Sequence, residues 1–150
     1  MSFTEGSYEK ALIALFENLG YQHQYGPNIE RDYYVPFYEE QLIESLTTIN
    51  YGKPRPAIDE AISKLKDIEI GSLPQRNELF MDYLQHGIEV SFFDGKEQCN
   101  DIIYLIDYND KNIKRNDFKV INQWTFVENS EKRADIILFV NGLQLVVIEL

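Results

Sequence analysis

The sequence has few of the residues that would place it in several common classes of protein. It contains one cysteine, Cys99, so no internal disulfide can form, and the opening residues MSFTEGSYEK include no apolar secretory segment. No apolar run approaches the roughly 18 residues that a membrane-spanning helix requires. We therefore expect a cytoplasmic protein that does not act in a membrane.

Several catalytic motifs are also missing. There is no G-x-x-x-x-G-K-[ST] phosphate loop, which would support ATP hydrolysis, and no G-x-S-x-G nucleophile elbow. Cys99 lies in EQCND, predicted as a polar turn, without an evident histidine partner, and neither His23 nor His86 has a second histidine at a ligand spacing. These absences argue against a nucleophilic side chain or a zinc site.

Positive charge is scarce, because 14 Lys and Arg residues face 25 Asp and Glu residues, for a net charge of −11. Proteins bind DNA largely by neutralising its phosphates with Lys and Arg. The isolated chain should therefore bind DNA weakly. A function on DNA is compatible with this charge if other parts of a larger assembly bring the chain to DNA while its acids hold cations.

The chain is long enough for one domain, residues 1–150, because 44% of its 150 residues are hydrophobic. Apolar residues at helical spacing predict a first helix over Tyr8–Leu19, with Ser7 as its N-cap and Gly20 as its stop. Its apolar stripe is formed by Tyr8, Leu12, Leu15, Phe16 and Leu19. An aromatic-rich loop with a short extended piece at Tyr33–Val35 follows.

Three more helices are predicted before the pattern changes to that of strands. They are expected at about residues 39–50, from Pro56 onward, and from Pro74 to a stop at Gly87. Strands are then expected at Ile88–Phe92, after an Asp94-Gly95 turn at Ile102–Ile106, and around residues 118–127. Helices followed by strands predict an α+β fold, in which amino-terminal helices pack on a carboxy-terminal mixed β-sheet.

The last residues, RADIILFVNGLQLVVIEL, carry the strongest local signal. Two β-branched apolar runs flank Asn141-Gly142, which is the dipeptide typical of a tight hairpin. Asp135 begins the first strand and Glu149 ends the second, so the hairpin brings two carboxylates into one neighbourhood. Paired carboxylates hold hard divalent cations such as Mg²⁺. Because both strands are apolar at nearly every position, we expect them to be buried on both faces.

The register of this hairpin decides whether the two carboxylates can share a metal. A strict two-residue turn would place Asp135 opposite Ile148 and leave Glu149 on the other face of the sheet. A register shift of one residue is therefore needed. We expect either a three-residue loop with Gly142 in the left-handed conformation or a β-bulge near Asp135.

These residues resemble a known family. An acid, an apolar strand, a turn and a second apolar strand ending in Glu resemble the PD-(D/E)xK nuclease motif, and ADIILFVNGLQLVVIEL is similar to the amino-terminal nuclease domain of type I restriction enzyme R subunits. The resemblance extends over YEKALIALFENLGY (8–21), RNELFMDYLQHGIEV (76–90) and FKVINQWTFVE (118–128). The Lys of the motif would fall directly after Leu150, so we expect a truncated piece of a longer protein with a restriction-endonuclease-like core.

The resemblance implies magnesium-dependent cleavage of double-stranded DNA, with Asp135 and Glu149 as the catalytic metal ligands. It also implies an additional metal-site acid on the first helix, where Glu9 is the matching position. In the family, ATP-driven translocase domains follow this region, and methylation and specificity subunits are partners. Without the motif Lys, residues 1–150 are expected to be nearly inactive.

The same residues are also compatible with roles that involve no metal. Asp135 and Glu149 could simply end two strands in solvent or pair with Lys132 and Arg133, and Glu9 could interact only with the helix dipole. Alternatives for the protein as a whole are a standalone repair or junction nuclease and a nuclease-like module that binds without catalysis. DNA target specificity, the metal used in the cell and the oligomeric state do not follow from the sequence.

Overall fold

The computed structural model describes residues 4–69, 73–109, 111, 115–127 and 129–150. The chain divides into two compact units, one formed by Met1–Glu39 with Asp117–Leu150 and the other by Glu40–Asn116. The fold is α+β, as predicted from the sequence. Among the helices of the described residues, none has the length and apolar character needed to cross a bilayer.

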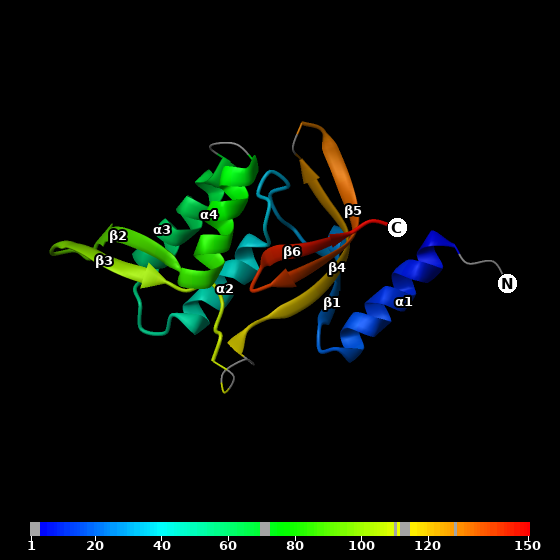
Figure 1. The fold of residues 1–150 in the computed structure, drawn as a ribbon, viewed down its shortest axis with the longest axis horizontal. Helices are drawn as coiled ribbons and strands as arrows, with labels where there is room; N and C mark the ends of the chain where they lie inside the picture. Colours follow the sequence, from blue (N-terminus) through cyan, green and yellow to red (C-terminus); the bar gives the residue numbers. More distant parts are fainter. Residues whose placement is uncertain (1–3, 70–72, 110, 112–114, 128) are drawn as a thin grey trace. The chain divides into compact units, whose positions relative to one another are not determined.

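The first unit contains a four-stranded mixed sheet in the order β1-β4-β5-β6 (Figure 1). Its strands are β1 (Gln22–Tyr25), β4 (Phe118–Val127), β5 (Glu131–Val140) and β6 (Leu143–Ile148). β1 runs parallel to β4, whereas β4, β5 and β6 form antiparallel pairs. A short 3₁₀ turn, Gly26–Asn28, follows β1.

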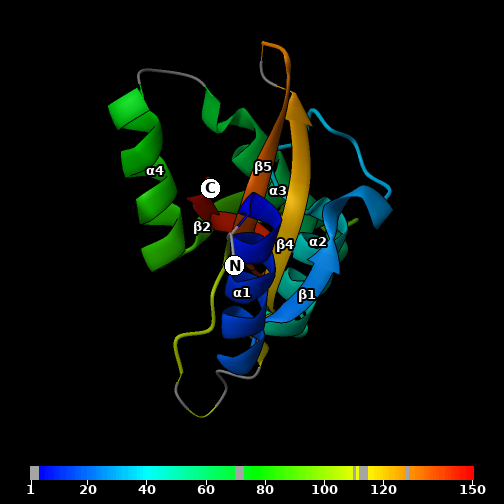
Figure 2. The ribbon, with the colours of Figure 1, turned by 90° about the vertical axis from the view of Figure 1, so that its right-hand side faces the viewer.

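Helix α1 (Glu5–Asn18) covers one face of this sheet, as Figure 2 shows with the helix in front of the strands. Its buried contacts come from Ile13, with Leu12 and Phe16 packed against the same cluster. Because Glu9, Ile13 and Phe16 follow helical spacing, the face turned toward the sheet includes Glu9. Tyr8, Leu15 and Leu19 are exposed, so the predicted apolar stripe was only partly right.

Two apolar clusters lie on opposite faces of the sheet. The helix-side cluster consists of Ile13, Val120, Ile136 and Leu138. The far-side cluster consists of Tyr38, Ile121, Trp124, Ala134, Ile137 and Phe139. Trp124 and Phe139 are fully buried, with their rings 4.7 Å apart. The sheet is therefore buried on both faces along β4 and β5.

The hairpin of β5 and β6 has a two-residue turn followed by a register shift. Asn141 and Gly142 both have positive φ, and Val140 pairs with Leu143 across them. Leu138 pairs with Val146 but Phe139 pairs with Gln144, so Leu145 is an extra residue on β6. The predicted shift is present as a bulge, located in the middle of the hairpin rather than beside Asp135, and the turn is not a three-residue loop.

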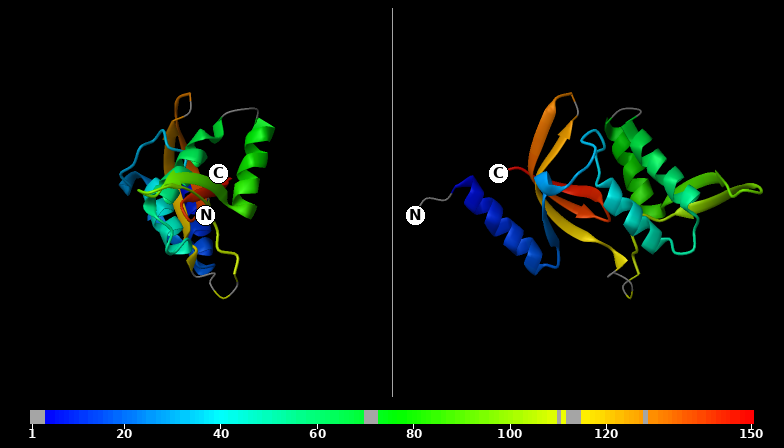
Figure 3. Two further views of the ribbon diagram at one scale, coloured as in Figure 1. Left: turned by 90° about the vertical axis from the view of Figure 1, so that its left-hand side faces the viewer. Right: turned by 180° about the vertical axis from the view of Figure 1, so that it is seen from behind.

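The second unit combines three helices with a separate hairpin. The helices are α2 (Glu39–Ile49), α3 (Arg55–Lys66) and α4 (Leu73–His86), and a 3₁₀ turn, Asp67–Glu69, follows α3. The strands β2 (Ile88–Phe93) and β3 (Gln98–Ile103) pair antiparallel. Figure 3 shows this hairpin beside α3. Its core contains Leu42, Leu46, Ile58, Ile88 and Ile103, all less than 2% exposed.

Several local predictions differ from the structure. Thr4, rather than Ser7, caps α1, because its side chain accepts a hydrogen bond from the Ser7 N–H. Tyr33–Val35 forms turns rather than an extended piece, and β1 was not predicted, because its QHQY sequence has no apolar pattern. The strand expected at 102–106 is shifted to β3, since pairing with β2 extends through the polar residues 98–101.

The expectation that both final strands are buried holds for β5 but is wrong for β6. Leu145, Val146 and Val147 are 38%, 45% and 54% exposed. Since β6 is the last strand in the order of the sheet, it has a hydrogen-bonded neighbour on one side only. The apolar residues of β6 therefore favour the strand conformation, but the part of the chain that the structure describes does not bury them.

Candidate metal centre

The hairpin brings Asp135 and Glu149 together. The bulge at Leu145 makes Ile136 pair with Ile148, so the next residues along the two strands, Asp135 and Glu149, lie opposite each other. The backbone N–H of Leu150 donates a 2.7 Å hydrogen bond to Oδ2 of Asp135. The predicted juxtaposition of the two acids is thus present, and the register shift is its cause.

Burial and neighbouring acids both act on the carboxyl of Glu149. The pKa of Glu149 is raised by partial desolvation, then by hydrogen bonding to the Asp135 carboxyl and by its charge, with a further contribution from Glu5. A hydrogen bond from the Asp135 backbone N–H lowers this pKa and offsets part of the rise. The carboxyl of Glu149 therefore lies among acids, a setting in which a bound cation would relieve the repulsion.

The first turn of α1, which includes Glu5, lies near the carboxyl end of the chain (Figure 1), in keeping with the effect of its charge on Glu149. Lys132 and Arg133 are the cations that could pair with the two acids in place of a metal. They lie on β5, opposite Phe126 and Thr125 of β4. Both are exposed. Neither Lys132 nor Arg133 is among the groups that shift the pKa of Glu149, which are Asp135 and Glu5 besides desolvation.

Glu9 lies on the same side of the sheet but is held by amides. Oε1 of Glu9 accepts a 2.7 Å hydrogen bond from Nδ2 of Asn122, and Nε2 of Gln123 donates to both carboxylate oxygens at 3.3 and 3.2 Å. Asn122 is in turn fixed by a 2.8 Å contact between its Oδ1 and Nε2 of His23. Glu9 therefore faces the sheet, and its contacts go beyond an interaction with the helix dipole.

The candidate ligand atoms of Glu9, Asp135 and Glu149 are all carboxylate oxygens, which are the ligands that a hard cation such as Mg²⁺ prefers. Asp135 and Glu149 meet directly. The ligand atoms of Glu9, Asp135 and Glu149 do not all lie within 4.8 Å of one another, since no such group occurs there among the described residues. Glu9 would need a side-chain movement or an intervening water to act with the pair.

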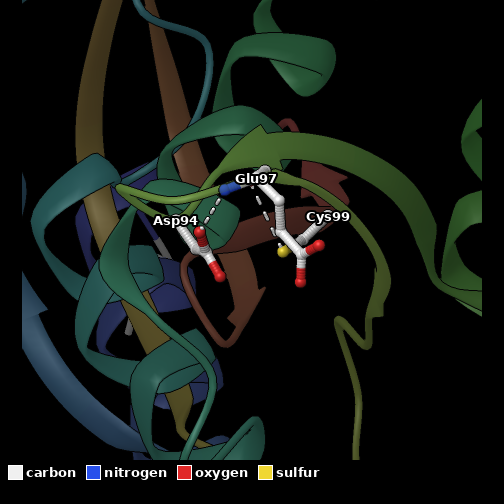
Figure 4. A group of neighbouring side chains, drawn as sticks. All are labelled: Asp94, Glu97 and Cys99. Atoms are coloured by element: carbon white, nitrogen blue, oxygen red, sulfur yellow. Dashed lines mark hydrogen bonds between the residues drawn. The ribbon is translucent and has the colours of Figure 1, made fainter.

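A second group of possible ligands lies at the turn between β2 and β3 (Figure 4). Ligand atoms of Asp94, Glu97 and Cys99 lie within 4.8 Å of one another. Oδ1 of Asp94 accepts hydrogen bonds from the backbone N–H groups of Lys96 and Glu97, at 2.8 and 2.9 Å. Desolvation and the nearby Asp94 raise the pKa of the Cys99 thiol. These contacts close the hairpin and disfavour a thiolate.

Asn122 and Gln123 were missed as candidate site residues. The signal available in the sequence is that they form a polar pair inside an otherwise apolar strand, between Val120-Ile121 and Trp124. A strand buried on both faces has no ordinary place for two consecutive amides. Their hydrogen bonds to Glu9 supply the reason for their presence.

Comparison with known proteins finds one family whose model matches almost the whole chain. The model of the family described as "Type I restriction enzyme R protein N terminus" matches residues 2–150. The type I restriction enzyme HindI endonuclease subunit of Haemophilus influenzae is 29% identical over 97% of this chain, which spans 15% of that relative's length. The type I restriction enzyme EcoprrI endonuclease subunit of Escherichia coli is 30% identical over 98% of this chain, which spans 44% of its length.

Proposed function

Because the chain belongs to the family of type I restriction enzyme R protein N termini, we propose that it is the nuclease region of a restriction endonuclease subunit. Its reaction would be Mg²⁺-dependent hydrolysis of DNA phosphodiester bonds. The observation that carries this proposal is the contact between Asp135 and Glu149, which a one-residue register shift creates at the end of an apolar hairpin.

Each carboxylate has a distinct task in this proposal. Asp135 and Glu149 would hold the metal, and the hydrogen bond from the Leu150 N–H to Asp135 fixes the orientation of one of them. Glu9, held by Asn122 and Gln123, would assist from the helix side. When bound, Mg²⁺ would lower the pKa of a coordinated water and stabilise negative charge on the phosphate.

The remaining features of the activity belong to the longer protein. The chain spans less than half the length of the two relatives named above. We propose that ATP-driven translocase domains, and methylation and specificity subunits, act with this region on double-stranded DNA in the cytoplasm. Because the motif Lys is expected directly after Leu150, residues 1–150 are proposed to bind metal but to cleave DNA very slowly.

Metal binding by residues 1–150 tests the proposal directly. Mn²⁺ can replace Mg²⁺, and its binding is measured by electron paramagnetic resonance, because the signal of free Mn²⁺ decreases as the ion binds to the protein. We expect Asp135→Asn and Glu149→Gln each to weaken Mn²⁺ binding by at least about tenfold. Glu131→Gln, an exposed change on the same β5 strand, is the matched control and should bind like the wild type.

Cleavage is tested in a longer protein that carries a Lys after Leu150. Supercoiled plasmid should be nicked in the presence of Mg²⁺, and Asp135→Ala or Glu149→Ala should abolish nicking. Persistent nicking in both variants would exclude this site. Equal Mn²⁺ binding by the wild type and both carboxylate variants would also count against it.

The net charge of −11 favours a second candidate, a nuclease-like module that binds partners without catalysis. This candidate predicts no specific Mn²⁺ binding at Asp135 and Glu149. It also predicts no metal-dependent nicking by the longer protein, even with the Lys in place. The two experiments above therefore separate the two functions.

A further inference from the structure

Strand β4 contains an irregularity at Gln123. Its φ is +55°, a left-handed conformation that non-glycine residues rarely adopt inside a strand. The ladder with β5 pairs Asn122 with Ile136 and Trp124 with Ala134, and no regular pair is formed between them. Gln123 and Asp135 are the two residues that face each other in this gap.

The gap changes which way side chains point on β5. Ile136 belongs to the helix-side cluster, and Ile137 belongs to the far-side cluster, as ordinary alternation requires. Ala134 lies two residues from Ile136 and should share its face. It belongs instead to the far-side cluster. The alternation of faces along β5 is therefore interrupted at Asp135, and the residues before it lie on the face opposite to the one that alternation predicts. We call this interruption the reset.

The same reset occurs on β4. Val120 lies in the helix-side cluster and Ile121 in the far-side cluster, which places Asn122 on the helix side. Gln123 should then point to the far side, but its amide reaches Glu9 of α1 just as that of Asn122 does. Trp124 returns to the far-side cluster. Two consecutive side chains thus face α1.

This reset determines the surroundings of Asp135. With unbroken alternation along β5, Asp135 would share the face of Ile137 and Phe139 and would enter the far-side cluster. An unpaired carboxylate there would be expensive. Asp135 is instead half-buried, and its Oδ2 accepts a hydrogen bond from the Leu150 N–H just beyond the last pair of β5 with β6.

The backbone around Gln123 is also tightly packed from the β1 side. A Cβ atom on Gly26 would lie 2.4 Å from the Gln123 carbonyl oxygen and 2.8 Å from that of Asn122. Only glycine permits this approach, so the turn after β1 lies directly against the irregular segment. The pairing of β1 with β4 ends at Tyr25 and Asn122, just before it.

We propose that Gln123 is a positioning residue of the metal site. Its left-handed backbone keeps Asp135 out of the far-side cluster and beside the Leu150 N–H, and its amide helps Asn122 to hold Glu9. This inference rests on the proposed function for its link to a metal. The placement of Asp135 can be tested without any metal.

The metal-free test uses the backbone amide of Leu150, whose resonance depends on its hydrogen bond to Asp135. Gln123→Val disfavours a positive φ, so Asp135 should turn and the Leu150 amide should shift and lose protection from exchange in ¹⁵N-resolved NMR spectra. Gln123→Gly accepts a positive φ and should leave the Leu150 amide unchanged. Gln22→Val, the same change at an ordinary exposed position of β1, is the matched control.

The metal-dependent test measures Mn²⁺ affinity of the same variants. Gln123→Val should weaken binding by at least about tenfold, as loss of an outer-shell partner typically does. Gln123→Gly should weaken it by less than about tenfold, since Asn122 still holds Glu9. Rescue by glycine, which lacks any side chain, is an outcome that a role in packing alone would not produce.

The inference is overturned if valine and glycine at position 123 have equal effects, or if the Leu150 amide is unchanged in Gln123→Val. If valine prevents folding, Gln123→Ala replaces it in the comparison with glycine, because alanine also disfavours a positive φ. A wild-type chain that binds no Mn²⁺ would overturn the proposed function. The Leu150 amide would then still decide whether Gln123 positions Asp135.

Discussion

The backbone N–H of Leu150 donates a 2.7 Å hydrogen bond to Oδ2 of Asp135. The bond joins the end of β6 to the middle of β5, and it exists because the bulge at Leu145 moved the register by one residue. Glu149, the residue before Leu150, is thereby brought against the same carboxyl. The extra residue, Leu145, therefore sets the register that brings the two acids opposite each other.

The raised pKa of Glu149 predicts how stability depends on pH. A carboxyl whose pKa is raised on folding holds its proton more tightly in the folded state, so its stabilising contribution is complete below the ordinary value of 4.5. That contribution is lost as pH rises through the higher folded pKa. Glu149→Gln should therefore gain stability relative to the wild type between pH 4 and pH 7, by no more than about 1 kcal/mol because the site is exposed.

Urea unfolding at both pH values, followed by the fluorescence of Trp124, measures this difference. Glu17→Gln, an exposed change near the end of α1, is the control and should show a smaller pH dependence. Saturating Mg²⁺ should stabilise the wild type more than Glu149→Gln at pH 7. A relative stability of Glu149→Gln that falls with pH would contradict the assignment.

Asn141 is predicted to stabilise the hairpin in two separable ways. It is fully buried with a φ of +55°, and its Oδ1 accepts a 2.7 Å hydrogen bond from the Asp117 N–H. Asn141→Gly keeps the conformation but loses this bond, which should cost about 1–3 kcal/mol. Asn141→Ala should cost about 1 kcal/mol more, because a left-handed alanine is strained. Equal losses in urea unfolding would show that φ is not important here.

Gly26→Ala should be strongly destabilising. Its new Cβ would meet the backbone carbonyl oxygens of Gln123 and Asn122, which cannot rotate away as a side chain can. We expect a loss of about 1–3 kcal/mol and weaker protection of the β1 amides from hydrogen exchange.

Gly6→Ala, in the first turn of α1, is the matched control for this change, since its Cβ would lie 3.8 Å from Oγ1 of Thr4, an ordinary contact. It should stabilise the protein by about 0.5–1 kcal/mol through helix propensity. A neutral Gly26→Ala variant would mean that the turn after β1 can move away from β4.

Arg31 is predicted to contribute through packing rather than charge. Its guanidinium carbon lies 3.4 Å from the centre of the Trp124 ring, and desolvation lowers its pKa to about 10. Its Nε and Nη1 are buried and find no hydrogen-bond partner among the described residues. Arg31→Met, which keeps the packing and removes the buried charge, should change stability by less than about 1 kcal/mol.

Arg31→Lys keeps the charge but loses the planar stacking, and should cost about 1–2 kcal/mol. Thermal and urea unfolding of the two variants give the comparison. A methionine variant that is much less stable than the lysine variant would show that the charge itself is stabilising.

The sequence by itself determined the hairpin, its two acids and most of the helices. Asn141-Gly142 between β-branched runs specifies a tight turn through local conformational preference, and Pro56 and Pro74 mark helix starts for the same reason. Glu9 could be placed near the apolar face because helical spacing links it to Ile13. These features depend on residues close together in the chain.

Only the tertiary structure decided how the acids meet. The bulge at Leu145, the reset at Gln123 and the parallel pairing of β1 depend on contacts between segments distant in sequence. A period of two predicts alternating faces but cannot indicate where an alternation is interrupted. Gln123 has its positive φ where its amide donates to Glu9 and its carbonyl oxygen lies against Gly26. In our proposal this packing sets the direction of Asp135, because tertiary contacts rather than a local pattern decide where an alternation is interrupted.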